Sequence, residues 1–296
     1  MKCPGHPAAL AAAVGLGAAG LWGMCGSMVA SPARAAEPAA GRPAGAAAAP
    51  STPPDAFPMP ERDPDTLKDD ARGRLVRDGL DILQRTRIRL PAHVGNRLSC
   101  TNCHLDLGRR AGAAPWVGVH AAYPQYRART GGVDTLEDRV NDCFERSLNG
   151  KALPAGAPEM KAIVTAMAWL SEGVPVGRLV KGRGVPPLKP AEPPDANRGR
   201  RLYAQHCACC HAPNGQGVGE VPPLWGNASF NVGAGMARQW TAASFIRANM
   251  PLGQGGTLTP REAHDIAAWV LAQPRPDFPA KGLDWPQGGK PPDCPY

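Results

Sequence analysis

The sequence predicts a mainly α-helical fold made of two tandem domains that repeat one plan. Each half opens with a helical segment in which a Gly is followed, three and four residues later, by apolar side chains. Each half then presents a Cys-x-x-Cys-His segment and closes with a helix that carries a Trp. No convincing pair of strands is found. The opening segments are Gly79 with Ile82 and Leu83, and Gly199 with Leu202 and Tyr203.

The closing helices are predicted at Pro158–Ser171 and Pro260–Gln273. Their apolar residues recur at the spacing of one buried helix face. Trp169 and Trp269 occupy matching places and are interpreted as packing residues. The apolar faces consist of Met160, Ile163, Val164, Met167 and Leu170, and of Ala263, Ile266, Ala267 and Val270.

Composition and helical pattern divide the chain into segments. We expect a flexible Ala/Pro-rich segment at 36–64, a first domain at 65–173, a Pro-rich linker at 174–194, a second domain at 195–273 and a Pro-rich tail at 274–296. The chain has 35 Gly and 34 Pro among 296 residues, which agrees with long irregular connections.

Residues 1–35 resemble an export signal. Lys2 supplies a positive start, a short apolar stretch follows, and the small residues around Arg34 offer a cleavage site near Ala35. A retained membrane anchor is the alternative. Cleavage predicts a periplasmic location and leaves seven cysteines in an oxidising compartment, so each of them needs a role.

Two Cys-x-x-Cys-His segments indicate covalent haem attachment. Two thiols three residues apart can add to the two vinyl groups of one porphyrin, and the adjacent His then lies beneath the iron. A zinc site or a redox dithiol is the alternative, but two such segments in repeated helical contexts favour haem. The residues are Cys100, Cys103 and His104 in the first segment, and Cys207, Cys210 and His211 in the second.

The predicted fold is therefore two tandem cytochrome c-type domains, each wrapped around a covalently bound haem. A content of only 5% aromatic residues agrees with a large apolar cofactor in each interior. The formal net charge is +8, and loss of Lys2 and Arg34 with the signal would leave +6. That excess is too small to indicate a nucleic-acid partner, although it could attract a small anion.

Counting forward from each proximal His suggests the distal iron ligands. Met250 lies 39 residues after His211, in a loop before the last helix, and is favoured over Met236. In the first domain the same count from His104 ends on Cys143. A thiolate ligand lowers a haem potential, whereas Met raises it.

Alternatives remain for the cysteines. Cys143 could instead form half of a disulfide with Cys294 or Cys209, although the equal spacing favours ligation. Once haem and ligand roles are assigned, Cys209 and Cys294 remain, and we predict that they form a disulfide. Cys209 could also be a tolerated variable position, and Cys294 a loose thiol.

The residues around Cys143 are cationic and polar. Arginine side chains match oxyanions, and nearby cations favour a thiolate. This surrounding predicts a site for a small sulfur oxyanion, although a solvated surface is the simpler alternative. The residues are Arg127, Arg129, Arg139, Arg146, Ser147, Asn149 and Lys151.

From about Asn96 to Gln273 the chain resembles the dihaem thiosulfate dehydrogenases, also called tetrathionate synthases. The resemblance rests on four runs: residues 98–105, 123–127, 139–151 and 245–253. It implies a His/Cys haem at the active site and a second haem that passes electrons outward. By this resemblance Cys143 is catalytic and a ligand, and Arg129, Arg139 and Ser147 contact substrate.

The implied reaction couples two thiosulfates to tetrathionate with release of two electrons. Its acceptor would be a periplasmic protein such as a small c-type cytochrome or a high-potential iron-sulfur protein. Some members have a Lys before the Met of the second haem; here Asn249 stands there, so a Lys-to-Met ligand switch is not expected. A dihaem electron carrier without turnover, or the same enzyme acting as a tetrathionate reductase, remains open.

Overall fold

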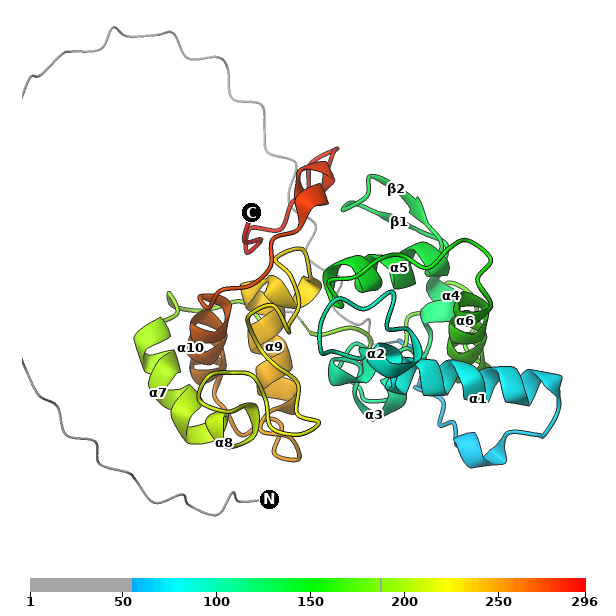
Figure 1. The fold of residues 1–296 in the computed structure, drawn as a ribbon, viewed down its shortest axis with the longest axis horizontal. Coiled ribbons are helices and arrows are strands. Elements are labelled where there is room, and N and C mark those ends of the chain that lie inside the picture. The colour runs from blue at the N-terminus through cyan, green and yellow to red at the C-terminus, as the bar shows by residue number, and fades with distance from the viewer. Residues whose placement is uncertain (1–54, 187) are drawn as a thin grey trace, which may run out of the picture. The chain divides into compact units, whose positions relative to one another are not determined.

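The computed structural model describes residues 55–186 and 188–296, which belong to one compact unit. The predicted signal at 1–35 and most of the segment at 36–64 lie outside these ranges. The first half contains short turns of 3-10 helix and these elements (Figure 1): η1 (Pro64–Thr66), α1 (Ala71–Gln84), α2 (Thr86–Arg89), η2 (Cys100–Asn102), α3 (Leu105–Gly108), α4 (Val119–Ala122), β1 (Gln125–Arg127), β2 (Gly132–Asp134), α5 (Leu136–Arg146) and α6 (Pro158–Leu170).

The second half is helical as far as the structure describes it. None of the helices in the described ranges is long and apolar enough to cross a membrane. The elements are α7 (Ala196–His206), α8 (Ala208–His211), η3 (Gly235–Ala237), α9 (Gln239–Asn249), α10 (Pro260–Leu271) and η4 (Pro279–Leu283). The predicted mainly α fold is confirmed.

The two halves repeat the same helix crossing. In the first half α1 packs on α6, and in the second α7 packs on α10. A Cβ at Gly79 would lie 2.1 Å from the carbonyl oxygen of Ala162, and one at Gly199 would lie 1.9 Å from that of Asp265. Both glycines are thus needed because the helix backbones touch there.

Side-chain caps define where several of these helices begin. Thr135 and Asp138 form a capping box at α5, and Thr259 and Glu262 form another at α10. The carboxylate of Asp70 accepts a hydrogen bond from the amide of Gly73 at 2.7 Å and starts α1.

A small antiparallel hairpin was not predicted. Strands β1 and β2 pair Gln125 with Asp134 and Arg127 with Gly132. Each strand has three residues, too few for an alternating pattern to stand out in the sequence. The expectation of no strand pair was wrong here.

The largest core cluster lies within the first half but takes in residues of the second. Phe144, Ile163 and Leu170 are fully buried in it. Phe230 and Ala234, from the loop before α9, belong to the same cluster. A separate cluster around Tyr203 and Ile266 forms the core of the second half.

The end of the predicted flexible segment is packed rather than free. The amide of Phe57 donates to the carbonyl of Leu179 at 2.8 Å, and the amide of Lys181 donates to the carbonyl of Phe57 at 2.9 Å. Val180, between them, is buried. Residues 55–64 therefore contact the segment 174–194, which the sequence predicts to be a linker.

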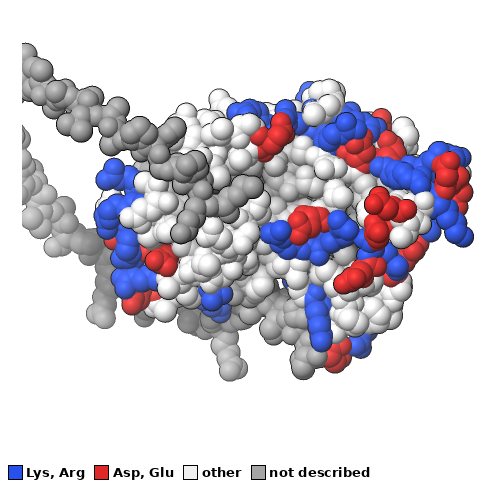
Figure 2. All heavy atoms as spheres, turned by 90° about the horizontal axis from the view of Figure 1, so that it is seen from below, with Lys and Arg blue, Asp and Glu red and all other residues white. Residues whose placement is uncertain are grey.

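Basic and acidic side chains are intermingled on one face. In Figure 2 the Lys and Arg groups in its right-hand part lie beside Asp and Glu groups. Helices α1 and α2 supply such a pair, Asp78 of α1 with Arg89 of α2 at 2.7 Å. These exposed pairs divide the positive charge into small patches and contribute little to stability.

Candidate active site

The first Cys-x-x-Cys-His segment begins with the turn η2. The Nδ1 atom of His104 lies 2.6 Å from the carbonyl oxygen of Ala114, so Nδ1 carries the proton and Nε2 keeps its lone pair. The Trp116 ring packs against the imidazole, with centroids 5.1 Å apart. This arrangement presents an oriented nitrogen ligand.

A cavity extends from this segment toward α5. It is lined by Cys100, Cys103, His104 and Cys143, together with Arg139 and Ser147. A c-type haem fits this set, because two thiols three residues apart and a free imidazole nitrogen share one apolar cavity. Its apolar walls include Leu83, Leu98, Trp116, Phe144, Leu148 and Met167.

The second segment has the same design. Cys207 precedes α8, which carries Cys210 and His211. His211 Nδ1 lies 2.9 Å from the carbonyl oxygen of Pro222, and burial lowers the pKa of His211. A neutral imidazole with a free Nε2 is the form that binds iron. The hydroxyl of Tyr203 donates to the carbonyl of Ala212 at 2.7 Å and holds the end of this segment.

The two candidate methionines differ in position. Met250 is partly exposed and directly follows α9, whereas Met236 packs against two core clusters. Asn249, before Met250, is 2% exposed, and its amide donates to the carbonyls of Phe245 and Gly112. The Asn249 side chain is therefore buried and held by these two hydrogen bonds.

Cys143 differs chemically from the other cysteines of the cavity. Burial raises the pKa of its thiol, but the charge of Arg139 and the neighbouring His104 side chain outweigh this effect and lower the pKa to about 7. Burial instead raises the pKa of Cys100 and of Cys103 to about 12. Only Cys143 of these three is poised as a thiolate near neutral pH.

Arg139 makes the closest cationic contact with this sulfur. Its Nη1 atom lies 2.8 Å from the Sγ atom of Cys143, one turn apart on α5. Ser147, at the end of α5, also lines the cavity. The structure thus brings Arg139, Ser147 and Cys143 together.

Arg129 lies elsewhere. It is absent from the cavity wall, and its Nη1 atom donates to the carbonyl of Gly233 at 2.6 Å. Its guanidinium also lies 3.8 Å from Asp284 and stacks over Trp285. The Arg129 guanidinium is therefore fixed by residues of the second half and of the tail, and it does not line the cavity.

Two carboxylates in this region were missed. Asp142 pairs with Arg127 and Arg146, and Asp284 binds Arg146 through both carboxylate oxygens at 2.7 and 2.8 Å. Burial opposes ionisation of Asp142, but its arginine neighbours, Arg139 foremost, hold its pKa below the ordinary value. Asp142, one residue before Cys143, was visible in the sequence, but nothing local pointed to Asp284.

The predicted disulfide between Cys209 and Cys294 is not formed. Cys294 is a free thiol, and the Sγ of Cys209 lies 3.7 Å from that of Cys210. The prediction by elimination was wrong because the tail around Cys294 packs elsewhere: Asp293 accepts a hydrogen bond from the amide of Trp240, and the Tyr296 ring packs on Trp285.

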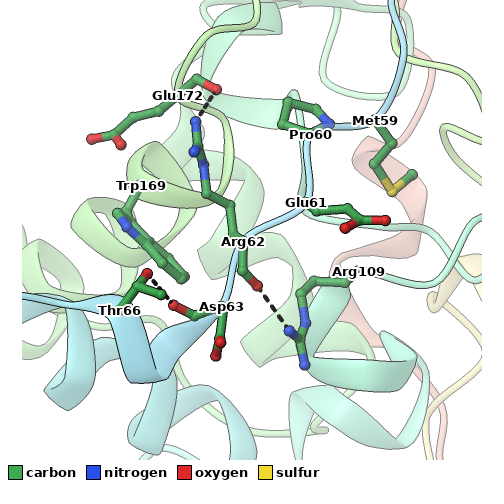
Figure 3. Close-up of a pocket in the computed structure, with 9 residues that line it drawn as sticks. All are labelled: Met59, Pro60, Glu61, Arg62, Asp63, Thr66, Arg109, Trp169 and Glu172. Carbon is green, nitrogen blue, oxygen red and sulfur yellow. Dashed lines mark hydrogen bonds between the residues drawn. The ribbon is translucent and has the colours of Figure 1, made fainter.

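A further cavity, of about 790 Å³, holds none of the predicted site residues (Figure 3). Arg62 donates to the carbonyl of Glu172, and Arg109 donates to the carbonyl of Arg62 across it. Its charged groups thus tie the N-terminal segment to the first domain.

Two family descriptions match the chain. Residues 92–176 match "SoxA/TsdA, cytochrome c domain", and residues 194–270 match "Cytochrome C oxidase, cbb3-type, subunit III". Each match contains one Cys-x-x-Cys-His segment, and such domains bind haem c covalently.

Relatives that match over most of their length decide the family. A thiosulfate dehydrogenase of Psychrobacter arcticus is 45% identical over 237 residues, which cover 78% of this chain and 72% of that protein. The chain belongs to the thiosulfate dehydrogenase family. A member from Allochromatium vinosum is 47% identical over 72% of this chain and 82% of its own length.

A solved structure agrees with this assignment to the thiosulfate dehydrogenase family. The thiosulfate dehydrogenase (TsdBA) of Marichromatium purpuratum, in its as-isolated form, superposes with a TM-score of 0.71 at 42% identity. The match covers 76% of this chain and spans half the length of that one. The predicted cytochrome fold is thus confirmed by a member of the same family.

Proposed function

We propose that this chain oxidises two thiosulfate ions to one tetrathionate ion at Cys143. The observation that carries the proposal is the 2.8 Å contact between Arg139 Nη1 and Cys143 Sγ inside the cavity of the first Cys-x-x-Cys-His segment. A sulfur nucleophile beside a fixed cation is what coupling of sulfur anions requires.

The proposed cofactor is two covalent haems. Cys100 and Cys103 would hold the first covalently, and His104 and Cys143 would bind its iron. Cys207 and Cys210 would hold the second, and His211 and Met250 would bind its iron. When bound, the haems supply sites for the two electrons. The Nδ1 contacts of both histidines support these assignments because each leaves Nε2 free for iron.

The coupling is proposed to proceed in two steps that balance. The thiolate of Cys143 joins the terminal sulfur of one thiosulfate, forming Cys143–S–S–SO3(−) and releasing two electrons. The terminal sulfur of a second thiosulfate then attacks the outer sulfur of that disulfide link. The S–S bond to Cys143 breaks, tetrathionate leaves, and the thiolate is restored.

Charge repulsion between the two dianions is the barrier that the protein must offset. Arg139 is placed to stabilise both the thiolate and an incoming anion, and the Ser147 hydroxyl can donate a hydrogen bond from the same wall. Arg129 is proposed to contribute positive charge from beneath the tail, although it does not line the cavity. Figure 1 shows α5, which carries Arg139 and Cys143.

The proposed setting is the periplasm, after cleavage near Ala35. Electrons would pass from the 65–173 domain to the 195–273 domain, and then to a small c-type cytochrome or a high-potential iron-sulfur protein. The loop before α9 supports such a route, because Phe230 packs in the core of the first half and so joins the two domains.

The test is an assay of the haem-loaded protein with thiosulfate and ferricyanide, with tetrathionate quantified. We expect one tetrathionate for every two ferricyanide ions reduced. A redox-active protein that forms no tetrathionate would instead be an electron carrier. Mass spectrometry of the denatured protein should show two covalent haem additions, and a single addition would contradict the dihaem assignment.

A further inference from the structure

The C-terminal tail reaches the candidate catalytic sulfur through a continuous chain of ion pairs. Asp284 binds Arg146 through both oxygens at 2.7 and 2.8 Å, and Arg146 binds Asp142. Asp142 lies 3.6 Å from Arg139, which donates to Cys143 at 2.8 Å. Three side chains, those of Arg146, Asp142 and Arg139, thus connect Asp284 with the sulfur.

Three of the residues in this series of ion pairs have largely buried side chains. The side chains of Asp284, Arg146 and Asp142 are 4%, 9% and 13% exposed. Ion pairs so deeply buried are little screened, and removing one partner leaves the other charge uncompensated. The pairs among these three residues are therefore buried ion pairs and not surface pairs, and they end at Arg139, whose side chain is 36% exposed.

The same tail segment also holds Arg129. Asp284 lies 3.8 Å from its guanidinium, and the Trp285 ring lies 4.9 Å from it. The backbone takes part as well, because the amide of Trp285 donates to the carbonyl of Arg129 at 2.8 Å. Phe278 stacks on Arg146 at 4.1 Å. Arg129 and Arg146 are thus both covered by aromatic rings of the tail.

We propose that Asp284 is a positioning residue that sets the arginines of the thiosulfate site from the C-terminal tail. The inference rests on the proposed function, since it assigns Arg139 and Arg129 to substrate. Asp284 acts through Arg146 and Asp142 on Arg139, and directly on Arg129. An arginine side chain has many rotamers, so a buried carboxylate that selects one lowers the entropic cost of binding an anion.

Two possible roles of the Asp284 carboxylate predict opposite changes in KM for thiosulfate when it is removed. If Asp284 acted only as a negative charge near an anion site, its loss would strengthen thiosulfate binding and lower KM. If it holds the arginines in place, its loss frees them and raises KM. The direction of the change therefore separates positioning from charge alone.

The experiment compares four haem-loaded proteins: wild type, Asp284→Asn, Asp284→Glu and Asp277→Asn. Asp277 is the matched control, because it is 62% exposed, lies in the same segment and pairs with Lys281. We expect KM to rise about tenfold in Asp284→Asn, the loss of one charge-assisted hydrogen bond, with kcat within about twofold. Asp284→Glu should recover part of the loss, and Asp277→Asn should match wild type.

Haem absorption should be unchanged in all four proteins, because none of the substitutions removes a residue that would hold a haem. An unchanged or lowered KM in Asp284→Asn overturns the proposal, as does an equal change in Asp277→Asn. Should Asp284→Asn fail to load haem, Trp285→Leu replaces it, since it keeps every charge and removes the ring from Arg129. There KM should rise about threefold, and an unchanged KM would overturn the proposal.

Failure of the proposed function is recognised separately. If the wild-type protein forms no tetrathionate, that function fails for all four proteins alike. Positioning is then decided by calorimetric titration of the oxidised holoproteins with thiosulfate. Weaker binding in Asp284→Asn but not in Asp277→Asn supports it, and equal binding overturns it.

Discussion

Arg139 and Cys143 lie four residues apart on α5, and the guanidinium Nη1 of Arg139 is 2.8 Å from the Cys143 sulfur. Residues at this spacing share one face of a helix, so the contact is local and needs no distant element to form it. The capping box of Thr135 and Asp138 starts this helix just before Arg139. A cation and a sulfur are thus presented together to the haem cavity.

Arg139→Ala should weaken thiosulfate use while leaving covalent haem attachment intact. Removing a charge-assisted contact to sulfur and substrate predicts a fall in kcat/KM on the order of 30-fold. The measurement is ferricyanide-coupled thiosulfate oxidation. The control is Arg74→Ala, an arginine that is 62% exposed and pairs only with surface Asp69. Equal kinetics in the two variants would remove Arg139 from the site.

Cys143→Met should leave a folded cytochrome with two covalent haems but almost no tetrathionate formation. Methionine can still bind iron, and it raises the potential of a haem relative to a thiolate. It cannot form the S–S link to thiosulfate that the coupling requires. Redox titration should show one raised potential. Wild-type turnover in this variant would exclude the sulfur of Cys143 from the reaction path.

Met250→Ala should remove the near-infrared sulfur-to-iron band of the oxidised protein and lower the potential of the second haem. Met250 lies in the loop that follows α9, whereas Met236 packs in two apolar clusters. Met236→Ala is the matched variant and should keep the band while losing stability through lost packing. Loss of the band in Met236→Ala alone would reverse the ligand assignment.

Gly199→Ala should destabilise the second domain. Its Cβ would lie 1.9 Å from the carbonyl oxygen of Asp265, so α7 must move away from α10. We expect a loss of about 1–3 kcal/mol in the free energy of unfolding, measured by guanidinium denaturation. Gly282→Ala is the control, because no atom lies within 4 Å of its added Cβ. Equal stabilities would show that the helices can adjust without cost.

Local patterns determined much of this protein. Apolar spacing at i, i+3 and i+4 predicted the helices that close each half, because residues at this spacing share one helix face. The glycines at 79 and 199 predicted the repeat because they recur in the same local pattern in each half. The Cys-x-x-Cys-His segments are equally local. The cytochrome fold and the family were therefore predictable. The individual ligands and catalytic residues stay predictions until they are tested.

Tertiary structure alone decided which charges meet. The sequence showed a run of arginines near Cys143, but it could not show that Asp284, 138 residues after Arg146, lies against that arginine. Nor could it show that Arg129 lies under Trp285 or that Cys294 stays unpaired. Long-range pairs depend on how loops and the tail pack, and no periodicity along the chain encodes that packing. Helices and attachment segments follow from neighbours in sequence, whereas the electrostatics of the site follow from neighbours in space.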